Sequence, residues 1–387
     1  TGYVTDTEGD SYYYNTNGTL ITGWQKLKGE ENYRYFDAAG DGNGRLVGVE
    51  RSLSKREEDV QTVVSGRTTN TYHWYTIDDS GCTVKGSRYC FLNNKTLLKN
   101  RQSIDGKYYW FHSSTGALYT GYFAIGQNRY YSNADGTVYT GFDPCIKGDP
   151  AAPDPSAANV NYYNVYGQRV TGWQTIPNVK NGPRYYFNAN GVMLKGICWI
   201  GNTRYVFDPD NGQLVTDVQR PVVMKDGKTY YANANGTLKT GWNRFYEDGE
   251  YIWRCLSAST GEYLNTVNDL DPDLEDGPFM PEVDRYVWYH VTEGEEAGIY
   301  CIYNNSSVLK NYQNIGGKRY YFNNVSGKLQ KGWFQAGVNT CYSDVDTGVI
   351  TSGFQEIGDS TYYLNTNGLP LKGWQRIYNS TAKIYSY

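Results

Sequence analysis

The chain has few of the residues that catalysis and metal binding use most often. Its 387 residues include only three histidines, His73, His112 and His290, which lie in unrelated sequence contexts. A general base shared by similar segments is therefore absent. Neither a Cys-x-x-Cys nor a His-x-x-x-His spacing occurs, which argues against a zinc site.

Acidic residues are frequent, but they lie in turns rich in glycine and proline, where solvated carboxylates are expected. The best calcium candidate, the alternating run of Asp269, Asp271 and Asp273, continues with Leu274 where a calcium loop needs glycine. We therefore expect no catalytic residue, no metal and no cofactor, and we predict that the chain is not an enzyme.

Charge and hydropathy exclude two further classes of partner. The formal net charge is −4 and no basic stripe occurs, whereas a nucleic-acid-binding surface needs clustered Lys and Arg. No apolar run approaches the length of a membrane span, and no secretory signal is visible. We predict neither nucleic-acid binding nor membrane insertion.

The seven cysteines do not form an obvious disulfide framework. An odd count leaves at least one thiol unpaired, and connectivity does not follow from sequence. Cys90 and Cys301 occupy equivalent positions in two similar segments. The other five have no counterpart of this kind: Cys82, Cys145, Cys198, Cys255 and Cys341. We expect most of them to be buried free thiols.

What the chain has in abundance is aromatic residues arranged in a repeat. It contains ten Trp, 40 Tyr and 12 Phe. A Tyr-rich strand, an Asn/Asp-Gly turn and a short strand that ends in Thr-Gly-Trp or a variant recur along it, most plainly from Arg184 to Gly196. The closing glycines are Gly2, Gly23, Gly121, Gly141, Gly172, Gly196, Gly241, Gly332, Gly353 and Gly373.

The repeat predicts an all-β fold. Asn-Gly and Asp-Gly pairs supply the positive φ that tight hairpin turns require. They occur at Asn17-Gly18, Asp135-Gly136, Asn190-Gly191, Asn235-Gly236 and Asn367-Gly368. A single hairpin cannot bury its apolar face, but stacked neighbours can. We therefore predict a β-solenoid of stacked short β-hairpin repeats.

A longer duplication overlies the short repeat. Cys90 and Cys301, Tyr122 and Trp333, and Tyr131 and Tyr342 keep one offset, and Trp24 pairs with Trp242. We predict a first copy over 1–240 and a second over 241–387. Two atypical stretches, 49–71 and 265–285, are read as caps, extra strands or binding loops, and the Pro-rich insert 145–158 as an exposed loop. Because the chain opens inside a repeat, we expect it to be part of a larger protein.

The motif Thr-Gly-Trp-Gln, followed after a spacer by Arg/Lys-Tyr-Tyr-Phe-Asn-x-x-Gly, resembles the cell-wall-binding repeat superfamily. This superfamily covers choline-binding modules, the glucan-binding repeats of glucansucrases and the repetitive region of large clostridial toxins. The resemblance spans nearly the whole chain apart from the atypical stretches. It implies a β-solenoid that binds small ligands in shallow aromatic sites between successive hairpins.

Departures from the choline-binding pattern favour a sugar. In that pattern a Trp opens the Tyr-Tyr strand and a Met follows the turn glycine by two, completing a cage for a quaternary ammonium. The opening position here holds Ser11, Arg129, Arg184, Thr229, Arg319 and Thr361, and the methionine position holds Leu20, Val138, Leu238, Leu329 and Pro370, with Met193 the one exception. An arginine in the cage opposes choline, whereas aromatics beside Arg, Gln and Asn suit sugars.

The candidate ligand-binding residues are the aromatics after the closing glycines, the glutamines that follow some of them, and the tyrosines of the next strand. They are Trp24, Gln25, Tyr122, Tyr131, Trp173, Gln174, Tyr186, Trp242, Trp333, Tyr342, Trp374 and Gln375. The alternative at each position is a structural ring that joins one hairpin to the next.

The sequence thus predicts a secreted or cell-surface bacterial module that binds a polysaccharide or oligosaccharide. An α-glucan such as starch or dextran is the favoured ligand, bound through many weak sites. Three alternatives stay open. They are attachment to the bacterial cell wall through choline or peptidoglycan, recognition of host glycans by a toxin or adhesin region, and a purely structural spacer or an enzyme whose site lies in the atypical stretches.

Overall fold

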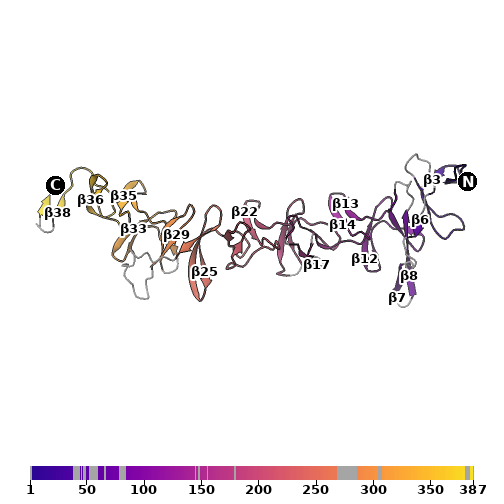
Figure 1. Cartoon of the computed structure of the whole chain (residues 1–387), viewed down its shortest axis with the longest axis horizontal. Helices are drawn as coiled ribbons and strands as arrows, with labels where there is room; N and C mark the ends of the chain where they lie inside the picture. Colours follow the sequence, from indigo (N-terminus) through magenta and orange to yellow (C-terminus); the bar gives the residue numbers. More distant parts are fainter. Residues whose placement is uncertain are drawn as a thin grey trace. The chain divides into compact units, whose positions relative to one another are not determined.

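The structure is a computed structural model. It describes residues 2–37, 44, 46, 49–51, 60–64, 67–77, 84–143, 145–146, 149–154, 156–177, 180–267, 286–303, 307–379 and 384–386. The contacts divide the chain into two compact units, Thr1–Leu194 and Lys195–Tyr387. Short antiparallel sheets follow one another along each unit (Figure 1).

The first unit contains β1 (Gly2–Thr5), β2 (Ser11–Tyr14), β3 (Leu20–Ile21), β4 (Gly23–Gln25), β5 (Arg34–Phe36), β6 (Val49–Arg51), β7 (Val60–Val64), β8 (Arg67–Ile77), β9 (Arg88–Leu92), β10 (Thr96–Leu97), β11 (Asn100–Ile104), β12 (Lys107–Phe111), β13 (Gly121–Ile125), β14 (Asn128–Ser132), β15 (Gly141–Asp143), β16 (Cys145–Ile146), β17 (Asp149–Pro153), β18 (Asn161–Tyr163), β19 (Gly172–Thr175) and β20 (Arg184–Phe187).

The second unit contains β21 (Gly196–Ile200), β22 (Thr203–Phe207), β23 (Val222–Val223), β24 (Thr229–Tyr230), β25 (Gly241–Glu247), β26 (Glu250–Leu256), β27 (Tyr263–Leu264), β28 (Thr266–Val267), β29 (Tyr286–Val291), β30 (Gly298–Tyr303), β31 (Ser307–Val308), β32 (Asn311–Ile315), β33 (Lys318–Phe322), β34 (Gly332–Ala336), β35 (Asn339–Ser343), β36 (Gly353–Ile357), β37 (Ser360–Leu364), β38 (Ile377–Asn379) and β39 (Ile384–Ser386). The described residues contain no helix, so the predicted all-β class is confirmed. None of them forms a helix able to span a membrane.

The main hairpins pair a strand that opens with glycine and the Tyr-rich strand that follows it. In β13 and β14, Gly121 faces Ser132 and Ile125 faces Asn128, and Gly126 closes the tip with a φ of 61°. The sequence prediction had joined the strands on either side of the Asn/Asp-Gly turn instead. That pairing forms two-residue ladders, as between β2 and β3 or between β26 and β27, and in other repeats it shrinks to single bridges such as Ser132 to Val138.

The segment after each Asn/Asp-Gly turn pairs so briefly because it also docks on an earlier hairpin. The Val138 amide donates to the Tyr108 carbonyl at 2.8 Å, and the Leu238 amide donates to the Arg204 carbonyl at 3.0 Å. In these repeats the residue two positions after the turn glycine is therefore a backbone link between hairpins; Pro370, which follows Gly368 by two, has no amide hydrogen to donate. This link satisfies polar groups that a lone hairpin would leave unpaired.

The turn glycines are needed for space as well as for φ. Gly236 has a φ of 83°, and a Cβ added there would lie 2.4 Å from Cδ1 of Leu214, the residue that follows the preceding turn glycine by two. In the same way, a Cβ added at Gly136 would lie 2.3 Å from Cδ2 of Leu118. We call these turn-glycine contacts. Similar contacts join Leu20 to Gly44, Val138 to Gly167, Arg169 to Gly191, Leu238 to Gly261 and Leu329 to Gly348, and, from turns without a glycine, Leu97 to Gly116 and Val308 to Gly327.

The strand-opening glycines differ from the turn glycines. Gly241 has a φ of 69° with nothing within 4 Å of its missing Cβ. Asn100 and Asn311 occupy the same opening position in β11 and β32, at φ values of 59° and 61°. Asparagine tolerates this left-handed region better than other side chains. The opening position therefore requires positive φ but not the absence of a side chain.

Two of the core clusters consist of similar residues. One cluster contains Trp74, Cys90, Ile104, Phe111 and Leu118. The corresponding cluster in the second unit contains Trp288, Cys301, Ile315, Phe322 and Leu329. The copy boundary at 240 stays a prediction, because the division after Leu194 separates groups of contacts rather than sequence copies.

The atypical stretches and the insert are described only in part. In the first stretch, β6 and β7 both pair with β8, so it supplies extra strands. In the second stretch, β28 pairs with β29, and residues 268–285 lie outside the described residues. The Pro-rich insert, predicted to be a loop, contains the short pair of β16 and β17.

The described cysteines are free thiols, as predicted. Cys90, Cys255, Cys301 and Cys341 are buried and Cys198 is partly buried. Burial, reinforced by the Glu296 carboxylate, raises the pKa of the Cys255 thiol to about 12. Burial also raises the pKa of Cys301. Cys82 lies outside the described residues, as does the side chain of Cys145.

Asp208 is a buried carboxylate that closes the turn after β22. Its Oδ1 accepts hydrogen bonds from the backbone amides of Asp210 and Asn211, both at 3.0 Å, and its Oδ2 accepts one from Arg220. Burial alone raises the pKa of a carboxyl group, but these donors outweigh it and hold the pKa of Asp208 below its usual value.

Candidate functional site

The hairpin register brings the predicted aromatic residues together in cross-strand pairs. The residue after the opening glycine faces a tyrosine of the partner strand, as Trp173 faces Tyr186 and Trp333 faces Tyr342. Their ring centroids lie 5.2 and 5.1 Å apart, in the edge-to-face arrangement that aromatic pairs prefer. The pairs differ in what else surrounds them, and this separates packing rings from exposed ones.

Trp24 and Trp242 pack into the cores. Trp24 lies 5.0–5.4 Å from the rings of Tyr35, Tyr75, Tyr89 and Phe91, on its own hairpin and on β8 and β9. Trp242 likewise lies 5.7 and 5.0 Å from Tyr289 and Tyr300 on β29 and β30. Both indoles join one hairpin to the next, which is the structural alternative considered for these positions.

The ring of Trp173 is covered by a cation from its own hairpin. The Arg184 guanidinium carbon lies 4.5 Å from the indole centroid. The register explains the contact, because Trp173 faces Tyr186 and Arg184 lies two residues away on the same face. An incoming cation would have to displace this guanidinium from the indole.

Trp333 forms an aromatic group with two tyrosines of successive hairpins. Its ring lies 5.1 Å from Tyr342 on β35 and 5.1 Å from Tyr362 on β37, edge-to-face in both cases. The indole remains 42% exposed. Within the described part of the chain, no Lys or Arg lies over it. We call these three residues the Trp333 group.

A second aromatic group surrounds Tyr122. This ring is 70% exposed and lies 4.6 Å from Tyr131, which in turn contacts Tyr139 and Tyr163 at 5.4 and 5.8 Å. The Tyr122 hydroxyl donates to Asp143 Oδ2 on β15 at 2.8 Å. Partial burial of the hydroxyl and this hydrogen bond raise the pKa of Tyr122 to about 12.

The predicted glutamines have a structural role. The side-chain amide nitrogens of Gln25, Gln174 and Gln375 donate to the carbonyls of Thr22, Thr171 and Lys372, three residues earlier, at 3.1, 2.9 and 2.8 Å. These bonds brace the chain at the opening glycine. Ligand binding by the three glutamines stays a prediction, for which their side-chain oxygens are the available groups.

Trp374 is the most exposed of the predicted rings, at 87%. Among the described residues it contacts no other aromatic ring. Phe354 is also open, at 68%, and its ring lies 4.9 Å from Tyr363.

The sequence analysis missed Trp199, which is 66% exposed. The residue after the opening glycine is Ile197 here, and the aromatic residue comes two positions later on the same strand face. Arg204 lies directly across from Trp199, with its guanidinium 5.4 Å from the indole centroid. The alternation of strand side chains was a signal that would have identified this ring.

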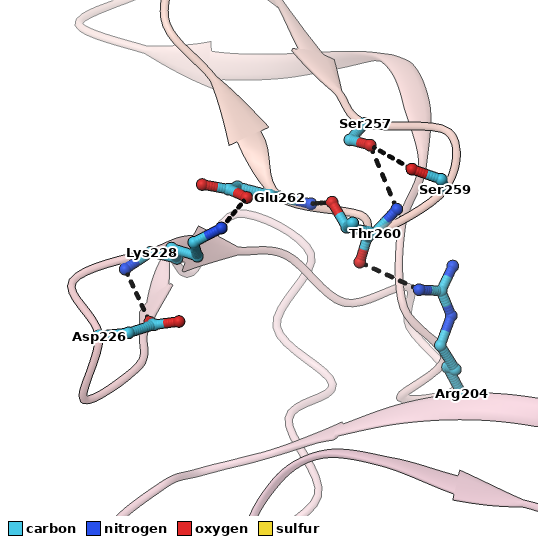
Figure 2. A network of polar contacts seen from close by, with 7 residues as sticks. All are labelled: Arg204, Asp226, Lys228, Ser257, Ser259, Thr260 and Glu262. Atoms are coloured by element: carbon cyan, nitrogen blue, oxygen red, sulfur yellow. Dashed lines mark hydrogen bonds and ion pairs between the residues drawn. The ribbon is translucent and has the colours of Figure 1, made fainter. Parts of the chain in front are cut away.

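Arg204 also links its hairpin to the turn after β26. Its Nη1 donates to the Thr260 carbonyl at 3.1 Å, and in the same region Lys228 forms a 2.6 Å ion pair with Glu262 (Figure 2). The bond to Thr260 fixes the guanidinium that lies beside Trp199.

Two family models match parts of the chain. Residues 160–218 match the choline-binding repeat, and residues 352–369 match the putative cell wall binding repeat. The chain is thus built of successive aromatic hairpins. Those over 160–218 and 352–369 match models of the cell-wall-binding repeat superfamily.

The curated relatives are long bacterial proteins. Glucosyltransferase-I of Streptococcus downei is 24% identical over 96% of this chain and 24% of its own length. Glucosyltransferase-S of Streptococcus mutans is 24% identical over 85% of this chain and 20% of its own length. The chain therefore spans a quarter or less of the relatives it matches.

Solved structures with similar repeats were also found. Choline binding protein F from Streptococcus pneumoniae, with a peptidoglycan analogue, is 17% identical, with a TM-score of 0.21 over 96% of this chain and 92% of that one. Alternansucrase in complex with isomaltononaose is 19% identical, with a TM-score of 0.24 over 94% of this chain and 22% of that one.

Proposed function

We propose that the chain is a non-catalytic carbohydrate-binding module that holds an α-glucan, starch-like or dextran-like, in shallow aromatic sites between hairpins stacked as a β-solenoid. The observation that carries this proposal is the Trp333 group, in which two tyrosines of successive hairpins support a partly exposed indole. We further propose that the module acts outside a bacterial cell or at its surface.

The geometry of the Trp333 group suits a sugar. An indole held by edge-to-face neighbours is a rigid apolar platform on which the apolar face of a pyranose ring can stack. Hydroxyl groups at the edge of the sugar then need polar partners. Gln335 lies on the same strand, and its amide nitrogen is held by Thr340 Oγ1 at 2.8 Å, which leaves its oxygen as an acceptor.

The names of the curated relatives support a glucan as the ligand, since both are glucosyltransferases. A module that holds a glucan beside an enzyme of this kind keeps the enzyme near its polymer. One shallow site binds in roughly the millimolar range, but tethered sites act at high effective concentration and increase avidity by on the order of 10² or more.

Calorimetric titration of the chain with isomaltooligosaccharides and maltooligosaccharides tests the proposal. Trp333→Ala is expected to remove one site, which lowers the measured stoichiometry, while the melting temperature falls less than in a variant that loses a core tryptophan. Trp242→Ala is the matched control, because this ring packs in a core. The control is expected to lower the melting temperature and leave oligosaccharide binding unchanged. Folded Trp333→Ala protein with the full wild-type stoichiometry would contradict the assignment.

Attachment to the cell wall through choline is the second candidate. One family model is named for choline binding, and the Trp333 group consists of aromatic rings that attract a quaternary ammonium. Against choline, Arg184 already covers Trp173. Titration with choline beside the glucans separates the two candidates, because saturation by choline with no glucan response reverses the ranking. A glycan array tests the remaining host-glycan alternative.

A further inference from the structure

The two aromatic groups described above occupy equivalent places in the duplicated sequence but differ in one polar residue. Tyr122 and Trp333 each come directly after an opening glycine, and the two residues are separated by the same number of positions as Cys90 and Cys301. The next glycine-opened strand begins Gly141-Phe142-Asp143 in β15 and Gly353-Phe354-Gln355 in β36. A carboxylate therefore stands in the first copy where a neutral amide stands in the second.

Asp143 is a half-buried carboxylate with spare hydrogen-bonding capacity. Within the described residues its recorded partner is the Tyr122 hydroxyl, which engages Oδ2. No ion pair of Asp143 occurs in this part of the chain. Burial raises the pKa of Tyr163, and the positive charge of the neighbouring Arg169 partly offsets this rise. The Arg169 side chain packs against the Gly191 turn, with Nε 2.5 Å from the position a Cβ would take there.

The charge beside Tyr122 is opposite to the charge beside several other rings. Arg184 lies over Trp173, Arg204 over Trp199, and Arg319 lies 4.9 Å from the Tyr312 centroid. These rings carry a cation of the chain itself. Arg129 lies two residues before Tyr131, at the register position that Arg184 has relative to Trp173, but no Lys or Arg of the described residues lies over the Tyr122 ring. The group bonded to the Tyr122 hydroxyl is the Asp143 carboxylate, so the charge favoured in a ligand at this edge of the ring is positive.

We propose that Tyr122 and Asp143 form a binding site for a sugar unit that carries a primary ammonium group. This inference rests on the proposed carbohydrate-binding function and names a second class of sugar for it. The pyranose ring stacks on Tyr122, and the ammonium donates a charge-assisted hydrogen bond to Asp143.

The same geometry discriminates between related ligands. An N-acetylated unit has no positive charge, and a quaternary ammonium has no N–H to donate to the carboxylate. At the equivalent place in the second copy, Gln355 donates through its amide nitrogen to the Ser352 carbonyl at 3.2 Å and carries no charge. The Trp333 group therefore keeps its preference for neutral sugars. The net charge of −4 also attracts a cationic polysaccharide at low salt.

The test uses one glycan backbone in two charge states. The intact chain is titrated by calorimetry with a β-1,4-linked glucosamine oligomer and with its fully N-acetylated counterpart, at low and at high salt. The glucosamine oligomer is expected to bind more tightly, and salt to weaken it. Asp143→Asn is expected to weaken its binding roughly fivefold to tenfold, the range between an exposed ion pair and a charge-assisted hydrogen bond. The Asn amide still accepts the Tyr122 hydroxyl, so the melting temperature is expected to change little.

Two further variants separate this inference from the proposed function. Trp333→Ala is expected to lose an isomaltooligosaccharide site and to keep the affinity for the glucosamine oligomer. Gln355→Asp is expected to give the Trp333 group a measurable preference for the glucosamine oligomer. Equal affinity for both charge states, or an unchanged glucosamine affinity in folded Asp143→Asn protein, overturns the inference. Tighter binding of choline than of the glucosamine oligomer at this site overturns it as well.

Discussion

Replacing a turn glycine by alanine should cost much more stability than replacing a strand-opening glycine. Gly236 and Gly241 lie five positions apart in the same unit, and both have positive φ, 83° and 69°. A new Cβ at Gly236 meets Cδ1 of Leu214 at 2.4 Å, closer than real Cβ contacts, whereas at Gly241 nothing lies within 4 Å. The two substitutions therefore share the backbone strain and differ in the clash.

The expected magnitudes follow from these two terms. Holding an alanine in the left-handed region costs about 1–2 kcal/mol, and the lower entropy of the unfolded chain returns about 0.4–1 kcal/mol at both sites. The clash adds about 1–3 kcal/mol at Gly236 alone, because Leu214 is buried and has little room to move. Gly236→Ala is therefore expected to destabilise the chain by about 1–3 kcal/mol more than Gly241→Ala.

Urea unfolding followed by tryptophan fluorescence measures the difference, and a double-mutant cycle tests its cause. Leu214→Ala is destabilising by itself, since it leaves a cavity. It also removes the atoms that a Cβ at Gly236 meets, so Gly236→Ala should cost less in the Leu214→Ala background. Leu214→Ala should leave the cost of Gly241→Ala unchanged. Equal losses for the two glycine variants in the wild-type background refute the reasoning.

Three further predictions concern the binding sites, pH and the thiols. Trp333→Ala combined with Phe354→Ala should reduce binding to insoluble glucan more steeply than either change alone, because avidity depends on the number of tethered sites; pull-down assays measure this. Ionised Asp208 has a lowered folded-state pKa. Its stabilisation is therefore complete above the unfolded carboxyl pKa, about 3.9, and is lost as pH falls through the lower folded value, so Asp208→Asn should flatten acid unfolding curves below about pH 4. Cys255 and Cys301 should resist iodoacetamide at pH 8 until denaturant is added, because burial raises the pKa of each thiol; peptide mapping by mass spectrometry identifies the labelled sites.

The sequence was sufficient for the fold class because its signals are local. Asn190-Gly191 and Asn235-Gly236 predict positive φ at their glycines, and both have it, at 73° and 83°. The partner of each strand is not a local property. The main ladder runs between a glycine-opened strand and the strand after it, across a tip without a fixed motif, such as Gly126-Gln127. The pattern around the Asn-Gly turn therefore predicted a shorter pairing than the hairpin contains.

The candidate site was predictable only in part. That Trp333 and Tyr342 would meet follows from the repeat, but Tyr362 comes from the next hairpin and requires the stacking geometry. Arg184 was predicted to oppose binding of a cation. Its position over Trp173, however, depends on the register between β19 and β20, which the sequence alone does not determine. Asp143 could not be told from a solvated turn carboxylate, because its partner Tyr122 lies on another hairpin.

The turn-glycine contacts bear on how the gene can change length. Nearly every described joint is made in the same way, with a glycine over a branched aliphatic side chain from the preceding turn, so one hairpin fits onto almost any other. Unequal crossing-over between similar repeats should therefore preserve the joints and yield folded products with more or fewer sites. The joint between Arg169 and Gly191 is different, because a guanidinium replaces the aliphatic group. A crossover within this repeat would place the Arg169 guanidinium against a hairpin that is shaped for an aliphatic side chain, or the reverse. We therefore expect exchange of repeats to occur on either side of this joint and not across it.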